Sequence, residues 1–160
     1  MSYFLLLGYL IVLCVIAIQD FKDRLVWWFL FPIAGVLAGL NYFEQSTSAP
    51  LFFLNIGLNT LTLTSILLIL VLVYKFILNK PLLNKSLGLG DILLFTVMIL
   101  GYPAITFIVL LSLALICSLI LSVLLQSNFG KFIPLAGLVS CFLVLAHCWS
   151  FAVNSNLYQY

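Results

Sequence analysis

The chain has only four acidic residues, and two of them lie at similar boundaries between apolar and charged sequence. Asp20 ends the first long apolar run, and Asp91 opens the fourth. If helix packing brings the two carboxylates together, such closely spaced like charges share one proton rather than both ionising. The ionised partner can then take a proton from an attacking water, and the protonated partner can donate to a peptide carbonyl oxygen. The pair therefore predicts the chemistry of aspartic proteolysis.

Each aspartate also has an interpretation without catalysis. Asp91 follows Gly88-Leu89-Gly90, and glycines allow a substrate backbone to come close to a carboxylate. However, an aspartate before an apolar run is also an ordinary start of a helix. Asp20, taken alone, is typical of a solvated residue at a membrane interface. The catalytic interpretation is favoured by the matching depth of the two aspartates in the predicted membrane topology.

The composition predicts the elements that must position this pair. Of the 160 residues, 66% are hydrophobic and 6% are charged, whereas a soluble domain carries about 25% charged residues. A helix that crosses a bilayer needs about 20 apolar residues, because the hydrocarbon core is about 30 Å thick. We therefore expect an all-α membrane protein with about six transmembrane helices, forming a single domain over residues 1–160. The apolar runs cover residues 2–19, 25–43, 51–78, 90–102, 104–126 and 132–153.

Three local features refine this prediction. A hairpin is expected at residues 101–103, because Pro103 would interrupt one long helix through the fourth and fifth runs. Asn55, Asn59, Thr60 and Thr62 form a polar stripe on the third run that is expected to mediate helix packing. No basic region precedes the first apolar run, so we expect a retained helix rather than a removable signal peptide.

The basic residues predict the orientation in the membrane. With six crossings, all six lysines and arginines fall on one side, which the positive-inside rule makes cytoplasmic. Both termini are then expected on the non-cytoplasmic side of a multi-pass protein of the cell (inner) membrane. The net charge of only +2 gives no sign of nucleic-acid binding. The basic residues are Lys22, Arg24, Lys75, Lys80, Lys85 and Lys131.

Two segments resemble the active-site motifs of the type IV prepilin peptidase family. Asp20 is followed four residues later by Arg24 and then by a branched apolar residue, as in the first motif of that family. The segment Gly88-Leu89-Gly90-Asp91 matches its GxGD motif. The resemblance extends, in order and in predicted topology, over essentially the whole chain. A third segment, Lys131-Phe132-Ile133-Pro134 followed by Ala136 and Gly137, is similar to a patch near the family's last helix.

The resemblance implies a small membrane aspartic endopeptidase in which Asp20 and Asp91 are the catalytic dyad. Gly88, Gly90 and Arg24 would support the two motifs. The substrate would be a type IV pilin-like or pseudopilin precursor that loses its short leader at the cytoplasmic membrane face, and no metal or other cofactor would be needed. The chain lacks the cysteine-bearing loop of longer members, which also N-methylate the trimmed pilin, so peptidase activity alone is expected.

Some residues depart from the family pattern and keep other functions open. Leu93 stands where many members have a lysine, and Trp27 and Trp28 stand where many have Pro-Asn. One alternative is a catalytically lapsed relative that acts as a membrane assembly partner. Another is a small transporter component, although transporters usually place charges or broken helices near the bilayer midplane. His147, the sole histidine, is expected to be a neutral packed residue far from the two aspartates.

Overall fold

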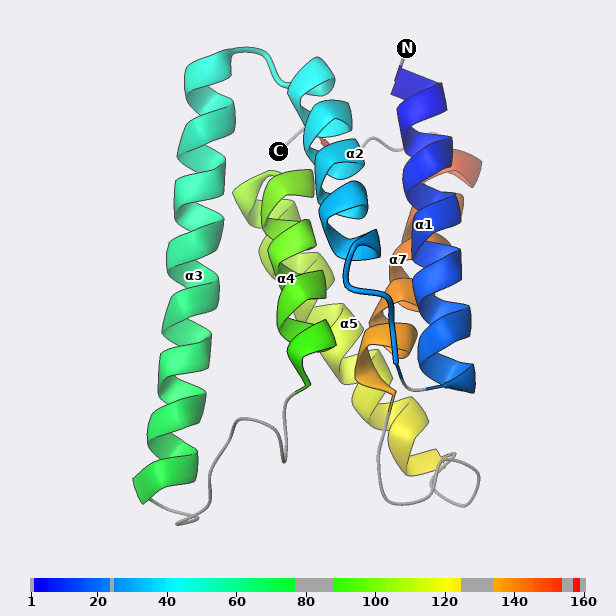
Figure 1. The fold of residues 1–160 in the computed structure, drawn as a ribbon. Helices are drawn as coiled ribbons and strands as arrows, with labels where there is room; N and C mark the ends of the chain where they lie inside the picture. Colours follow the sequence, from blue (N-terminus) through cyan, green and yellow to red (C-terminus); the bar gives the residue numbers. More distant parts are fainter. Residues whose placement is uncertain (1, 24, 77–87, 125–133, 154–156, 159–160) are drawn as a thin grey trace.

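A computed structural model of the chain describes residues 2–23, 25–76, 88–124, 134–153 and 157–158 (Figure 1). Throughout these residues the regular secondary structure is α-helical. Arg24, Lys80, Lys85, Lys131 and residues 132–133 of the third motif lie outside the described residues. The helices are α1 (Ser2–Lys22), α2 (Leu30–Gln45), α3 (Ala49–Phe76), α4 (Leu89–Gly101), α5 (Ala104–Leu124) and α7 (Leu135–Ala152).

Four of these helices, α1, α3, α5 and α7, are long and apolar enough to cross a membrane. The other two are shorter, with 16 residues in α2 and 13 in α4. At 1.5 Å per residue, α4 is about 20 Å long. Helices satisfy their backbone hydrogen bonds internally, which is what a lipid environment requires. The structure thus confirms an all-helical chain in which several helices are able to span a membrane.

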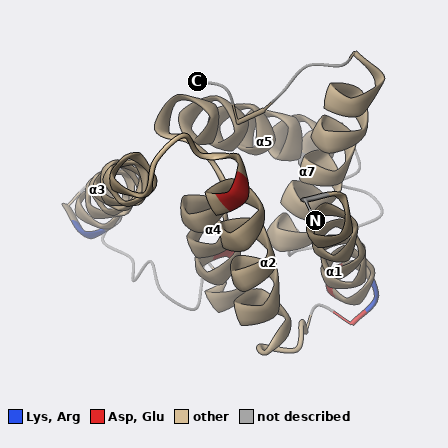
Figure 2. Cartoon of the chain, turned by 90° about the horizontal axis from the view of Figure 1, so that it is seen from above, with Lys and Arg blue, Asp and Glu red and all other residues tan. Residues whose placement is uncertain are grey.

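The helices run alternately in opposite directions, so that helix ends far apart in the sequence meet (Figure 1). We call the end of the bundle where α1 ends and α4 and α7 begin the site end. The opposite end, where the α2–α3 and α4–α5 connections lie, is the hairpin end. Viewed along the bundle, α3 stands at its edge and the few charged residues lie at helix ends (Figure 2). Among the described residues, the apolar middle of the bundle is therefore free of charge.

The predicted second helix begins later than expected, at Leu30 rather than residue 25. A helix that started at residue 25 would hold Pro32 in its interior, where its ring would meet the Trp28 carbonyl. Starting at Leu30 keeps Pro32 in the first turn, where no backbone N–H donor is needed. Residues 25–29 instead form an irregular segment, in which the Trp27 N–H donates to Oε1 of Gln19 at 3.1 Å.

The predicted hairpin between the fourth and fifth runs is present, with Tyr102 extended (φ −142°, ψ 150°) before Pro103. The third helix holds it in place, because Asn59 Nδ2 donates to the carbonyl oxygens of Ile99 at 3.1 Å and Tyr102 at 2.8 Å. Asn55 Oδ1 accepts from the Ala104 N–H at 3.1 Å. The two asparagines of the predicted polar stripe therefore do mediate helix packing. Its two threonines do not, because Thr60 and Thr62 donate to carbonyls of their own helix.

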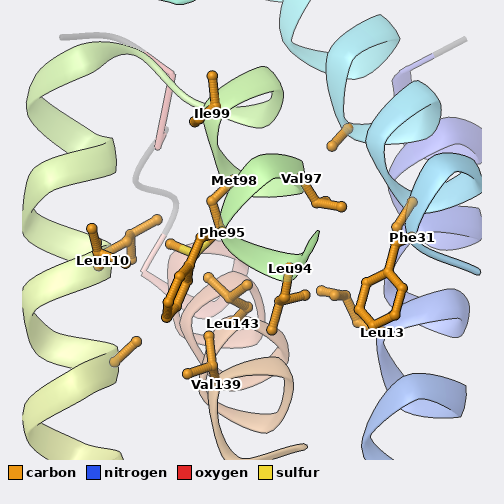
Figure 3. Packing of buried hydrophobic residues seen from close by; sticks show 14 of the residues in the cluster. Leu13, Phe31, Leu94, Phe95, Val97, Met98, Ile99, Leu110, Val139 and Leu143 are labelled. Atoms are coloured by element: carbon orange, nitrogen blue, oxygen red, sulfur yellow. The ribbon is translucent and has the colours of Figure 1, made fainter. Parts of the chain in front are cut away.

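The apolar core surrounds α4. Leu94 and Met98 are fully buried, and Leu94 lies beside Phe31 of α2 and Leu13 of α1 (Figure 3). On the other side of α4, Phe95 faces Leu143 of α7 (Figure 3). Because α4 contacts α2, α3, α5 and α7, its first turn is held against the helices around it.

Candidate active site at one end of the bundle

Asp20 lies on the last turns of α1, partly buried against the start of α7. Its Oδ2 accepts a hydrogen bond of 2.5 Å from the backbone N–H of Gly137. The first hydrogen bond within α7 runs from the Leu138 N–H to the Pro134 carbonyl, so the amides before Leu138 have no acceptor inside the helix. The carboxylate of Asp20 therefore fills an acceptor position that the helix itself leaves open, at the end where the helix dipole favours an anion.

Asp91 lies in the first turn of α4, at the same end of the bundle. Its Oδ2 accepts from the Gly88 N–H at 3.0 Å. Its carboxylate also interacts with the backbone N–H of Ala136 and experiences the negative charge of Asp20. The two aspartates are thus neighbours in space at the start of α7, where Asp20 bonds to the Gly137 amide and Asp91 lies near the amide of Ala136.

Two glycines make room for these contacts. A Cβ on Gly137 would lie 3.1 Å from Oδ2 of Asp20, and a Cβ on Gly88 would lie 3.2 Å from Oδ2 of Asp91. Both distances are tighter than ordinary van der Waals contact, so each carboxylate reaches the backbone because no side chain intervenes. The backbone of Gly88 is extended (φ −75°, ψ 151°), so its role is close approach and not an unusual conformation.

The other glycine of the GxGD segment has a weaker role. A Cβ on Gly90 would meet only the ring of Phe31, at 3.6 Å, which is an ordinary contact. Gly88 is therefore the motif glycine that the carboxylate requires, whereas the surroundings of Gly90 leave space for a methyl group. The contribution expected of Arg24 falls outside the described residues.

The sequence motifs did not predict that backbone N–H groups of α7 contact the two aspartates. In the sequence, Ala136 and Gly137 belong only to the third similar segment, which by itself indicates no function for them. The signal that could have revealed it is a proline followed by small residues at a predicted helix start: Pro134 caps α7, and Gly137 leaves space beside its own N–H. Which carboxylate would reach those amides depends on how α7 packs on α1, which the local sequence does not encode.

His147 is distant from this site. It lies in the second half of α7, at the hairpin end, where it is 5% exposed and its Nε2 is 2.8 Å from the hydroxyl of Tyr102. The packed state predicted for it is thus observed. Among the described residues, no group of three or more His, Cys, Asp or Glu side chains converges as a metal site would require.

Comparison of the chain with models of known families, with curated proteins and with solved structures finds no match. The geometry of the two aspartates and the sequence motifs that contain them are therefore what indicates a function.

Proposed function

We propose that the chain is a membrane aspartic endopeptidase of the prepilin peptidase type. It would remove the short leader of type IV pilin-like or pseudopilin precursors at the cytoplasmic face of the inner membrane. The observation that carries the proposal is the convergence of Asp20 and Asp91 on the amides of Ala136 and Gly137. Two residues from separate motifs, on separate helices, thereby share one small region at one end of an apolar bundle.

The chemistry follows from the mutual repulsion of the two carboxylates. Partly buried like charges that sense one another favour a state in which the pair holds a single proton. The ionised carboxylate would accept a proton from water as that water attacks the scissile carbonyl, and the protonated one would donate to the carbonyl oxygen. The backbone amides fix the orientation of both groups, so little rearrangement would be needed for the reaction.

The proposed topology has six crossings, with both termini outside and the site end in the cytoplasm. Lys22 and Lys75, the two lysines described, both lie on the last turns of helices at the site end. The remaining basic residues belong to chain segments that join helix ends there. Because α4 is shorter than the roughly 30 Å hydrocarbon core, local thinning of the bilayer would bring water to Asp91.

Charge-neutral substitutions test the dyad directly. Asp20→Asn and Asp91→Asn should each abolish the leader-sized mass shift of a co-expressed pilin-like precursor, while the chain still accumulates in the membrane. Asp23→Asn is the matched control, because Asp23 is exposed, close in sequence to Asp20 and not part of the proposed dyad. Full processing by either dyad variant would rule out the proposed mechanism.

A catalytically lapsed assembly partner is the second candidate, and one observation favours it. Asp91 accepts a hydrogen bond from the N-cap residue Gly88, which is what a purely helix-capping aspartate would do. This function predicts that precursors are not cut by the unaltered chain, although they co-purify with it. A leader-sized mass shift that depends on the unaltered chain excludes this candidate.

A further inference from the structure

A buried polar cluster lies at the hairpin end of the bundle, away from the two aspartates. The hydroxyl of Tyr102 is 2.8 Å from Nε2 of His147 and 3.4 Å from the hydroxyl of Tyr9. The rings of Tyr9 and His147 meet edge to face, with centroids 5.8 Å apart. The exposed fractions are 1% for Tyr9, 0% for Tyr102 and 5% for His147. These three side chains, which we call the Tyr–His cluster, are therefore linked to one another by hydrogen bonds and ring contacts.

The Tyr–His cluster joins the same three elements that carry the candidate active site. Tyr9 and Asp20 belong to α1, whereas Asp91 opens α4 and Tyr102 caps its end. His147 is on α7, whose first turn supplies the Gly137 amide to Asp20. Each element thus has one contact point at each end of the bundle.

The spacing along the helices strengthens this correspondence. Eleven residues separate Tyr9 from Asp20 and Asp91 from Tyr102, and ten separate Gly137 from His147. Eleven residues make about three helical turns, so Tyr9 and Asp20 lie on one face of α1. A rotation of α1 that broke the Tyr–His cluster would therefore also turn Asp20 away from α7. Tyr102 directly follows the last residue of α4, so its contacts fix the end of that helix opposite Asp91.

Polar contacts are well suited to fixing such a register. In lipid, apolar side chains gain little by packing on another helix rather than on acyl chains, whereas hydrogen bonds are directional. A buried hydroxyl left without a hydrogen-bond partner is destabilising, which disfavours rotated arrangements of the helices. The other contacts between α1, α4 and α7 are mainly apolar, and they discriminate less strongly between the observed arrangement of the helices and slightly rotated ones.

We propose that Tyr9, Tyr102 and His147 are positioning residues that set the register of α1, α4 and α7 and so bring Asp20 and Asp91 together. The kinetic part of this proposal rests on the proposed peptidase function. The geometric part does not, because the proximity of the two aspartate positions is measurable without any substrate.

The geometric test uses a chain whose four cysteines are replaced by alanine and in which Asp20→Cys and Asp91→Cys are combined. Oxidative or short maleimide cross-linking then reports how often the two positions meet. Adding Tyr102→Phe or His147→Leu should lower the cross-linked fraction severalfold. With His147→Gln in place of His147→Leu, the cross-linked fraction should stay near that of the parent, since the glutamine side-chain amide can take the place of Nε2 as hydrogen-bond partner of Tyr102. Tyr3→Phe, which removes the hydroxyl of a residue of α1 that is 76% exposed, should have no effect.

The kinetic test uses the unaltered aspartates. Tyr102→Phe and His147→Leu should lower kcat for precursor cleavage by about tenfold, because misplaced catalytic groups lose rate steeply, with KM nearly unchanged. Unchanged cross-linking in both variants would overturn the positioning role, as would lowered cross-linking with full kcat. If the unaltered chain cleaves no precursor, the proposed function fails, and the cross-linking result alone decides the inference.

Discussion

At the scale of single residues, Gly137 is where the backbone of α7 and the carboxylate of Asp20 come closest. An added methyl group would lie 3.1 Å from Oδ2 and 3.2 Å from Cβ of Asp20, so Asp20 would have to shift by a few tenths of an ångström. We expect Gly137→Ala to reduce the rate of precursor cleavage about tenfold or more, because even a small displacement of a catalytic group lowers the rate steeply. The measurement is the initial rate of leader removal in membranes that contain equal amounts of each variant.

Gly90→Ala is the comparison for this variant. A Cβ at position 90 has only an ordinary contact with Phe31, and alanine is favoured over glycine within a helix. We expect Gly90→Ala to retain cleavage within about twofold of the parent, since no catalytic group must move. Equal rates for Gly137→Ala and the parent would show that the Asp20 contact with the Gly137 amide is dispensable.

The pairing of the two carboxylates also predicts the dependence of cleavage on pH. When both are protonated the pair lacks a base, and when both are ionised it lacks an acid, so activity should fall on both sides of an optimum. The two apparent pKa values belong to the pair, because Asp91 senses the charge of Asp20. Rates of leader removal measured across the pH range check this, with Asp23→Asn expected to leave the profile unchanged. A rate that rises to a plateau with no second limb would indicate a single titrating group.

At the scale of helices, α3 contacts the rest of the bundle through its asparagines as well as through apolar residues such as Leu63. Asn59 is 1% exposed and donates to two carbonyl groups that the α4–α5 hairpin leaves open. We expect Asn59→Leu to lower the free energy of unfolding by about 1–3 kcal/mol, because those carbonyls lose their donor. Thr60→Val is the matched control, since the exposed Thr60 hydroxyl donates to Ile56 within its own helix. Thermal unfolding in detergent compares them, and equal midpoints for the two variants would contradict this role of Asn59.

The helices themselves were largely predictable, because apolar runs and proline breaks act locally. Five of the six helices begin within about three residues of the start predicted from the sequence, and helix boundaries commonly differ by a few residues. The start of α2 differs more, since Pro32 determines which residues precede the first turn. The convergence of Asp20 and Asp91 was predicted from their shared position at helix ends. Their attachment to Ala136 and Gly137 was not, because it arises only when α7 packs against α1.

At the scale of the whole molecule, the placement of charge ties the membrane topology to the proposed function. The site end carries Asp20, Asp91, Lys22 and Lys75, whereas Glu44 lies near the end of α2 at the hairpin end. A leader that is processed in the cytoplasm requires the site end to face the cytoplasm. The orientation of the bundle is therefore a condition for the proposed reaction and is testable apart from it.

Cysteine accessibility checks this orientation. In a chain whose four cysteines are replaced by alanine, Thr47→Cys marks the exposed α2–α3 connection and Asp23→Cys marks the exposed segment after α1. We expect a membrane-impermeant maleimide to label Thr47→Cys in intact spheroplasts and Asp23→Cys only after the membrane is opened, because the positive-inside rule keeps the lysine-bearing end in the cytoplasm. Labelling of Asp23→Cys from outside would leave both aspartates on the wrong face for a cytoplasmic leader. That result would exclude a cytoplasmic leader as the substrate. It would not affect the pairing of Asp20 and Asp91, since both lie at the same end of the bundle.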